Sequence, residues 1–258
     1  MPRFAANLNW MFTEWPLADR FAAAADAGFA AIEMLDPYEL PPDLLAAKLA
    51  RHRLTPALFN MAFGDSNAGE RGLAALPDRF PQLQEAVRTA LVYARATGAK
   101  RFHLVAGRAE RSDPRAVAAH RKAVTFAAET LAQDGIEVVL EPINNRDIPG
   151  FFLNDFDFAE TLIRDLALPN VRLQFDIYHR QILHGDVAVA LARLMPLIGH
   201  IQIASVPSRN EPDGEELNYP FLFNELDRLG YTGFVGCEYR PRTTTLQGLG
   251  WFAPYRRS

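Results

Sequence analysis

The chain has 258 residues, of which 49% are hydrophobic and 22% are charged, with a net charge of -4 and a pI near 5.9. This composition is ordinary for a soluble globular protein and excludes a disordered or collagen-like chain. The acidic balance provides no basic surface for nucleic acid or anionic membrane, so we expect a small-molecule substrate and neither of those partners.

The N-terminal segment MPRFAANLNWMFTEW has polar residues among its apolar ones and lacks the continuous apolar core of a signal peptide. No apolar run in the sequence is long enough to cross a bilayer, so we expect a cytoplasmic protein. Cys237 is the one cysteine, which excludes an intramolecular disulfide and a multi-cysteine zinc site. We expect Cys237 to be a packing residue.

Eight short β-rich runs alternate along the chain with segments of helical spacing. The predicted strands are residues 4–9, 31–35, 55–61, 101–106, 137–141, 171–176, 200–204 and 234–239, and the predicted helices are 17–27, 43–52, 83–97, 114–133, 156–165, 187–195 and 219–229. Helix starts are marked by Asp113, Asp155 and Asp186, and helix ends by Gly28, Gly98 and Gly230. This alternation predicts a parallel sheet with crossover helices.

We interpret the eight repeats as a single (β/α)8 TIM barrel domain over residues 1–258, since such barrels contain about 250 residues. A doubly wound open sheet is the alternative, but it normally has fewer strands, and no GxGxxG follows a strand here. The longest nonperiodic stretch, residues 64–81, includes GDSNAGERG. A loop of this length is often functional, and we interpret it as a candidate lid.

Four oxygen-bearing side chains stand at or near the ends of successive predicted strands. Glu141, Asp176, Gln202 and Glu238 are separated by 35, 26 and 36 residues, close to the spacing of neighbouring barrel units. Functional residues of such barrels lie at the carboxyl ends of the strands. Carboxylate and amide oxygens suit Mg²⁺ or Mn²⁺, whereas zinc is disfavoured because neither HExxH nor CxxC occurs.

Each of the four has a structural alternative. Glu141 suits a solvated strand end, Asp176 a helix cap, and Gln202 a hydrogen bond to backbone inside the barrel. Glu238 interrupts the apolar run FVGCEY, where an unpaired buried charge would be costly. A cation between two glutamates supports proton transfer next to a carbonyl, with one carboxylate removing a carbon-bound proton and another acid returning it to the adjacent carbon.

Longer motifs carry a family resemblance from the first strand to Arg240. GDSNAGERG, EPINNRDIPGFF, DIYHRQ, GHIQIA, NEPDGEELNYPF and GCEYRP together resemble the hydroxypyruvate isomerase family of xylose-isomerase-like barrels. The resemblance implies that Glu141 and Glu238 are the catalytic acid/base pair. It also implies that Glu141, Asp176, Gln202 and Glu238 bind the metal.

The resemblance further implies substrate contacts by His179 and by Arg209. Weaker candidates are Asp147, for a substrate hydroxyl, and His103, for the site wall. A substrate carboxylate needs a cation, for which Arg71, Arg108, Arg209 and Arg240 are candidates. Glu70 and Arg71 either close over substrate or only brace their loop. Many family members carry an aspartate where Ser205 stands, so contacts beyond Gln202 can differ.

The predicted function is a Mg²⁺- or Mn²⁺-dependent isomerase acting on hydroxypyruvate or a related 2-oxo sugar acid such as 2-oxotetronate. Three alternative functions stay open: an epimerase of free ketoses, a DNA-repair phosphodiesterase and a sugar-acid-binding protein without catalysis. The oligomeric state also stays open between a monomer and a homo-oligomer.

Overall fold

A computed structural model describes residues 1–65 and 69–256 of the chain. Within these residues, eight parallel strands close into one barrel in the order of the sequence. They are β1 (Arg3–Asn7), β2 (Ala31–Met34), β3 (Thr55–Asn60), β4 (Arg101–His103), β5 (Glu137–Leu140), β6 (Val171–Asp176), β7 (Ile198–Ile203) and β8 (Phe234–Cys237). The predicted TIM barrel is therefore confirmed, and the open sheet was the wrong alternative.

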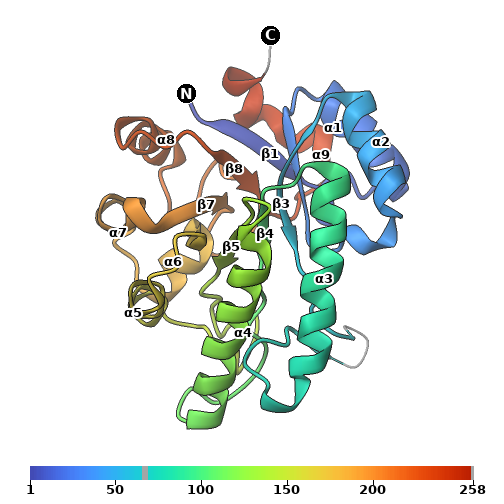
Figure 1. Ribbon diagram of the computed structural model, residues 1–258. Helices are drawn as coiled ribbons and strands as arrows, with labels where there is room; N and C mark the ends of the chain where they lie inside the picture. Colours follow the sequence, from blue (N-terminus) through green and yellow to red (C-terminus); the bar gives the residue numbers. More distant parts are fainter. Residues whose placement is uncertain (66–68, 257–258) are drawn as a thin grey trace.

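Helices surround the strands (Figure 1). They are α1 (Leu17–Asp26), α2 (Pro42–His52), α3 (Phe80–Thr97), α4 (Pro114–Ala132), α5 (Phe156–Leu166), α6 (Ile177–Leu183), α7 (Val187–Leu194), α8 (Tyr219–Arg228) and α9 (Thr245–Gly248), and a 3₁₀ segment, Leu249–Tyr255, follows α9. In the described part of the chain, none of them is long and apolar enough to span a bilayer.

Helix α5 illustrates how local sequence produces these elements. Its buried residues, Phe156, Ala159, Leu162 and Ile163, recur at helical spacing and form one stripe that faces the barrel. The Asp155 side chain accepts hydrogen bonds from the Asp157 and Phe158 amides, which have no partner within the helix. The stripe and the cap together explain why the helix begins where it does.

Most predicted boundary residues behave as expected. Asp113 caps α4 through the Arg115 amide, and Gly28, Gly98 and Gly230 have φ between 74° and 96°, in the left-handed region. The prediction for Asp186 is wrong in part. Asp186 stands at the N-cap of α7, but its own φ is 49° and its side chain makes no capping hydrogen bond.

Two helical segments were not predicted, α6 and the C-terminal α9 with its 3₁₀ extension. The first turn of α6 is buried on every side, so it has no polar and apolar periodicity to reveal it. Strand β4 is shorter than predicted because Val105 and Ala106 instead accept hydrogen bonds from the loop amides of Leu73 and Ala75. That contact ties the loop after β3 to the loop after β4.

The predicted lid, residues 64–81, contains positions 66–68, which lie outside the described residues. The described part is held together by Glu70, which pairs with Arg79 and accepts a hydrogen bond from the Asp65 amide. Glu70 therefore braces this loop through Arg79, whereas the alternative in which Glu70 and Arg71 pair with each other has no counterpart among the described ion pairs. Cys237 is buried in the core, as predicted.

Candidate active site and metal centre

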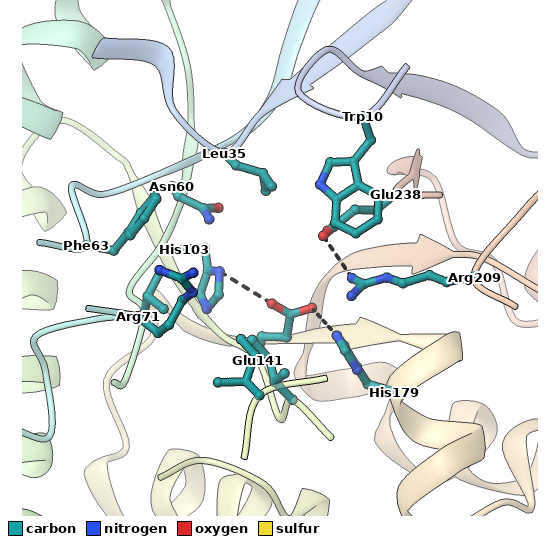
Figure 2. A pocket seen from close by; sticks show the side chains of 13 residues that line it. Trp10, Leu35, Asn60, Phe63, Arg71, His103, Glu141, His179, Arg209 and Glu238 are labelled. Carbon is teal, nitrogen blue, oxygen red and sulfur yellow. Dashed lines mark hydrogen bonds and ion pairs between the residues drawn. The ribbon is translucent and has the colours of Figure 1, made fainter. Parts of the chain in front are cut away.

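A cavity of about 290 Å³ opens at the carboxyl ends of the strands. It is lined by Trp10, Leu35, Asn60, Phe63, Arg71, His103, Val105, Glu141, Ile143, Ile148, His179, Arg209 and Glu238. One part of its wall is apolar and the rest carries charged or hydrogen-bonding groups, the usual character of a small-molecule site. Figure 2 shows Glu141 between two histidines and Glu238 beside Arg209.

Glu141 and Glu238 enter this cavity from different strands. Glu141 follows the last residue of β5 and Glu238 follows the last residue of β8, and they are 4% and 6% exposed. Asp176 ends β6, is 1% exposed, and accepts a hydrogen bond from the Tyr178 amide through Oδ1. Asp176 is therefore the N-cap of α6 and also lies in the site, so the predicted helix cap and the predicted site residue are compatible.

Burial of three acids close together makes their ionised forms unfavourable. Desolvation raises the pKa of Glu141 well above its usual value, and the charges of Glu238 and Asp176 add to this. Desolvation likewise raises the pKa of Asp176 to about 6 and that of Glu238 to about 8, although Arg209 lowers both. The site therefore favours a compensating positive charge.

A divalent cation fits the donors present. Oε1 of Glu141 and Oδ2 of Asp176 are buried and have no hydrogen-bond partner among the described residues. One ligand-type atom each from Glu141, Asp176 and His179 lies within 4.8 Å of the others. Unpartnered buried carboxylate oxygens are hard donors, which suit Mg²⁺ or Mn²⁺. Two of the four predicted metal ligands, Glu141 and Asp176, therefore each have a buried oxygen that is able to accept a cation.

The third member of that group, His179, is placed as a hydrogen-bond donor. Its Nδ1 lies 2.7 Å from Nδ2 of Asn144 and 3.4 Å from the Asn144 amide nitrogen, both of which are donors. The Asn144 carboxamide is oriented by its Oδ1, which accepts a hydrogen bond from the Asp147 amide. Burial lowers the pKa of His179 well below its usual value, so the neutral ring carries its proton on Nε2. That nitrogen faces Asp176 and Glu141, at 3.6 Å and 3.9 Å.

Arg209 links two carboxylates across the mouth of the cavity. Nη1 donates to Asp147 and Nη2 to Glu238, each over 2.9 Å. The guanidinium also lies over the rings of Trp10 and Tyr178. Because both ends of the guanidinium are held, Arg209 fixes one oxygen of Glu238 in place.

The remaining predicted substrate contacts divide into two groups. His103 and Arg71 line the cavity, and burial lowers the pKa of His103 to about 3, which keeps its ring neutral. Asp147 and Arg108 do not line it. Asp147 instead binds Arg209 and the Tyr178 hydroxyl, and the exposed Arg108 donates to the Gly69 carbonyl, so both support neighbouring groups.

Gln202 lies inside the barrel below the cavity and is fully buried. Its Nε2 donates to Glu238 over 2.7 Å, and its Oε1 accepts from Gln174 over 2.6 Å. Gln202 therefore reaches the site, but as placed it presents its nitrogen to Glu238.

Comparison with known proteins places the chain in a family. The family model for the xylose isomerase-like TIM barrel matches residues 21–255. The chain belongs to this family. The 2-oxo-tetronate isomerase of Cupriavidus necator is 51% identical over 99% of both chains, and the hydroxypyruvate isomerase of Escherichia coli K12 is 40% identical over 99% of this chain and all of that one.

These relatives confirm the predicted membership of the hydroxypyruvate isomerase family and the isomerase class of enzymes. Among solved structures, one described as an AP endonuclease, family 2, from Brucella melitensis is 45% identical over both full chains, with a TM-score of 0.97. A structure of L-ribulose 3-epimerase is 20% identical with a TM-score of 0.78, which shows a shared barrel and no more.

Ser205, a position at which we expect many family members to carry an aspartate, belongs to the loop that carries Arg209. Ser205 Oγ accepts a hydrogen bond from the Asn210 amide and contacts Ser208, within the loop that carries Arg209. The side chain does not line the cavity. Ser205 therefore stabilises the loop that carries Arg209 and would not contact a bound substrate directly.

Sequence reasoning missed Trp10, Asn60, Asn144 and Glu33. Glu33 had a signal, because it interrupts the apolar run AIEML in the same way that Glu238 interrupts FVGCEY. Trp10 and Asn144 lie in loops and Asn60 ends β3, and none of the three has a distinctive sequence spacing. Only the fold brings them to the site.

Proposed function

We propose that the chain is a Mg²⁺- or Mn²⁺-dependent isomerase that interconverts hydroxypyruvate and 2-hydroxy-3-oxopropanoate, or the corresponding 2-oxotetronate isomers. The observation that carries this proposal is the pair Glu141 and Glu238, two buried carboxylates facing one small cavity from β5 and β8. The names of the full-length relatives support the substrate class.

The residues proposed to hold the cation are Glu141 and Asp176, together with Gln202 and Glu238. Oε1 of Glu141 and Oδ2 of Asp176 each lack a hydrogen-bond partner among the described residues. Gln202 would have to offer its carboxamide oxygen for this purpose. When bound, a divalent cation would polarise the substrate carbonyl and make the neighbouring carbon-bound proton more acidic.

The chain's own residues would move that proton. One glutamate of the pair removes the proton from C3 of the 2-oxo acid, and the other delivers a proton to C2, while the hydroxyl hydrogen on O3 passes to O2 so that the carbonyl moves from C2 to C3. Arg209 holds one oxygen of Glu238 and thereby aims the other carboxylate oxygen. His103 lies 3.5 Å from Glu141 and steadies that carboxylate on the opposite side.

Two further groups would orient the substrate. His179 Nε2 carries a proton that it can donate to a substrate oxygen. Arg71 provides a cation in the wall of the cavity for the substrate carboxylate. Leu35, Phe63 and Ile148 line the apolar part of the cavity and limit the access of water.

Hydrogen exchange in heavy water tests the proposal. The purified protein with Mg²⁺ or Mn²⁺ is incubated with hydroxypyruvate, 2-oxotetronates and free ketoses, and deuterium incorporation and products are followed by NMR. We expect exchange at C3 and a 2-hydroxy-3-oxo product with at least one 2-oxo acid. Glu141→Gln and Glu238→Gln should each lower the rate by about 10²- to 10⁴-fold.

The same experiment separates the alternatives. An epimerase would invert a carbon of a free ketose without moving its carbonyl, and Arg71 in the wall disfavours such a neutral substrate. Binding of a 2-oxo acid without exchange would indicate a sugar-acid-binding protein. Cleavage of an abasic duplex, with no exchange on any small substrate, would indicate DNA repair.

A further inference from the structure

A polar layer lies inside the barrel beneath the cavity, where barrels usually carry branched apolar side chains. It includes Asn7 on β1, Glu33 on β2 and Gln174 on β6, together with His200 and Gln202 on β7. None of these five residues lines the cavity, and each is at most 1% exposed. Glu33 is the one carboxylate among them. A buried carboxylate outside the cavity requires an explanation because burial of its charge is costly.

Hydrogen bonds account for both oxygens of Glu33. Oε1 contacts Nε2 of His200, and Oε2 accepts from Nε2 of Gln202 over 3.0 Å and from Nδ2 of Asn7 over 3.4 Å. The donors come from β1, which is paired with β2, and from β7, which is not paired with β2. Glu33 is therefore the common acceptor of this layer.

Strand β8, which pairs with β7, leaves room for this carboxylate. Gly236 on β8 pairs in register with Gln202 on β7. A Cβ at position 236 would overlap Oε1 of Glu33, so a side chain there would displace the glutamate's carboxylate. The φ of Gly236 does not require glycine, so the need for glycine here comes from Glu33.

The Gln202 carboxamide connects Glu33 to the site. Nε2 of Gln202 has two hydrogens and donates to two carboxylates, to Oε2 of Glu33 over 3.0 Å and to Oε2 of Glu238 over 2.7 Å. Its Oε1 is held by Gln174. Rotating the amide by half a turn would place its oxygen against the two carboxylates, an unfavourable contact unless a proton or cation lies between them.

We infer that Glu33 is a positioning residue: it anchors the Gln202 carboxamide and, through it, the carboxylate of Glu238. This inference rests on the proposed function. Glu33 contacts neither the cavity nor the reacting atoms, so it acts by determining where Gln202 and Glu238 lie. Its loss should displace the Glu238 carboxylate, and should therefore impair proton transfer and the binding of a cation by Glu238 more than substrate binding.

Three variants test this role. Glu33→Ala should lower kcat about 10- to 100-fold and weaken Mn²⁺ binding about tenfold, effects typical of lost outer-shell partners, with KM within about twofold of the wild type. Glu33→Gln keeps an acceptor oxygen for Gln202 and should restore most of both properties. The double variant Glu33→Ala with Gly236→Ala fills part of the space left by the glutamate. It should show the same losses of kcat and Mn²⁺ affinity, and it provides the test if Glu33→Ala alone folds poorly.

Mn²⁺ affinity is measured by titration calorimetry and by electron paramagnetic resonance, independently of turnover, and folding by circular dichroism. Wild-type kcat and Mn²⁺ affinity in Glu33→Ala or in the double variant would overturn the inference, as would equal losses in Glu33→Gln and Glu33→Ala. An inactive wild type that binds Mn²⁺ would instead count against the proposed function, and the affinity series would still decide the role of Glu33.

Discussion

Asn144 determines which nitrogen of His179 carries the proton. Both the side-chain and the backbone nitrogen of Asn144 point at Nδ1 of His179, so the neutral ring keeps its hydrogen on Nε2, toward Glu141 and Asp176. The relationship joins the loop after β5 to the first turn of α6. It makes His179 a hydrogen-bond donor in the site, so that the proposed cation would be bound by the carboxylates.

Asn144→Asp should reverse this tautomer, because a carboxylate at position 144 accepts a hydrogen bond from Nδ1. We expect kcat/KM for the 2-oxo acid to fall about 10- to 100-fold, and ¹⁵N NMR of the ring should show the proton on Nδ1. Asn145→Asp is the matched control, since the exposed Asn145 contacts Asn154 instead. Equal losses in the two variants would contradict the role of Asn144.

Arg71→Met should raise KM for 2-oxo acids. The variant removes a charged hydrogen-bonding group from the cavity wall, a loss of about 1.5 to 3 kcal/mol, or roughly 10- to 150-fold in binding. Arg108→Met is the control, because Arg108 is exposed and outside the lining. Steady-state kinetics on hydroxypyruvate compare them. An unchanged KM in Arg71→Met would show that the substrate carboxylate binds elsewhere.

Removal of divalent metal should abolish activity and lower thermal stability. Glu141, Asp176 and Glu238 are buried together, so loss of a bound cation restores their mutual repulsion. A saturating cation at about 100 times its Kd should stabilise the fold by about 2.7 kcal/mol. Thermal denaturation with chelator, Mg²⁺ and Mn²⁺ measures this. Glu141→Gln should show a smaller stabilisation, and an equal one would place the cation outside this site.

His120→Phe should reduce the loss of stability in acid. His120 is buried in α4 against Phe152, and desolvation lowers its pKa to about 4. The unfolded value is about 6.5, so the unfolded chain binds the proton more tightly. This contribution to stability is complete above pH 6.5 and is lost as the pH falls toward 4.

Linkage gives the size of the effect. Between pH 7.5 and pH 4.5 the wild type should lose about 2 to 3 kcal/mol through His120, and His120→Phe should not lose this part. Urea denaturation of both proteins at the two pH values isolates the difference. If the two proteins lose stability equally, His120 does not titrate as its burial implies.

The sequence by itself determined the barrel architecture and which acidic residues lie together in the candidate site. Eight β-rich runs at nearly regular spacing leave few folds other than a closed barrel, and a parallel barrel brings the ends of its strands to one face. Glu141, Asp176 and Glu238 could therefore be assigned to one site without coordinates, because the topology alone determines their neighbourhood.

Only the tertiary structure decided what each side chain does there. Asp147 and Arg108 follow strands as a substrate contact would, yet loop geometry turns Asp147 toward Arg209 and Arg108 toward a backbone carbonyl. The tautomer of His179 depends on Asn144, 35 residues away in sequence, and the place of Glu33 depends on the absence of a side chain at Gly236. These relationships are contacts between distant segments, and their distances and directions are not encoded in the spacing of any motif.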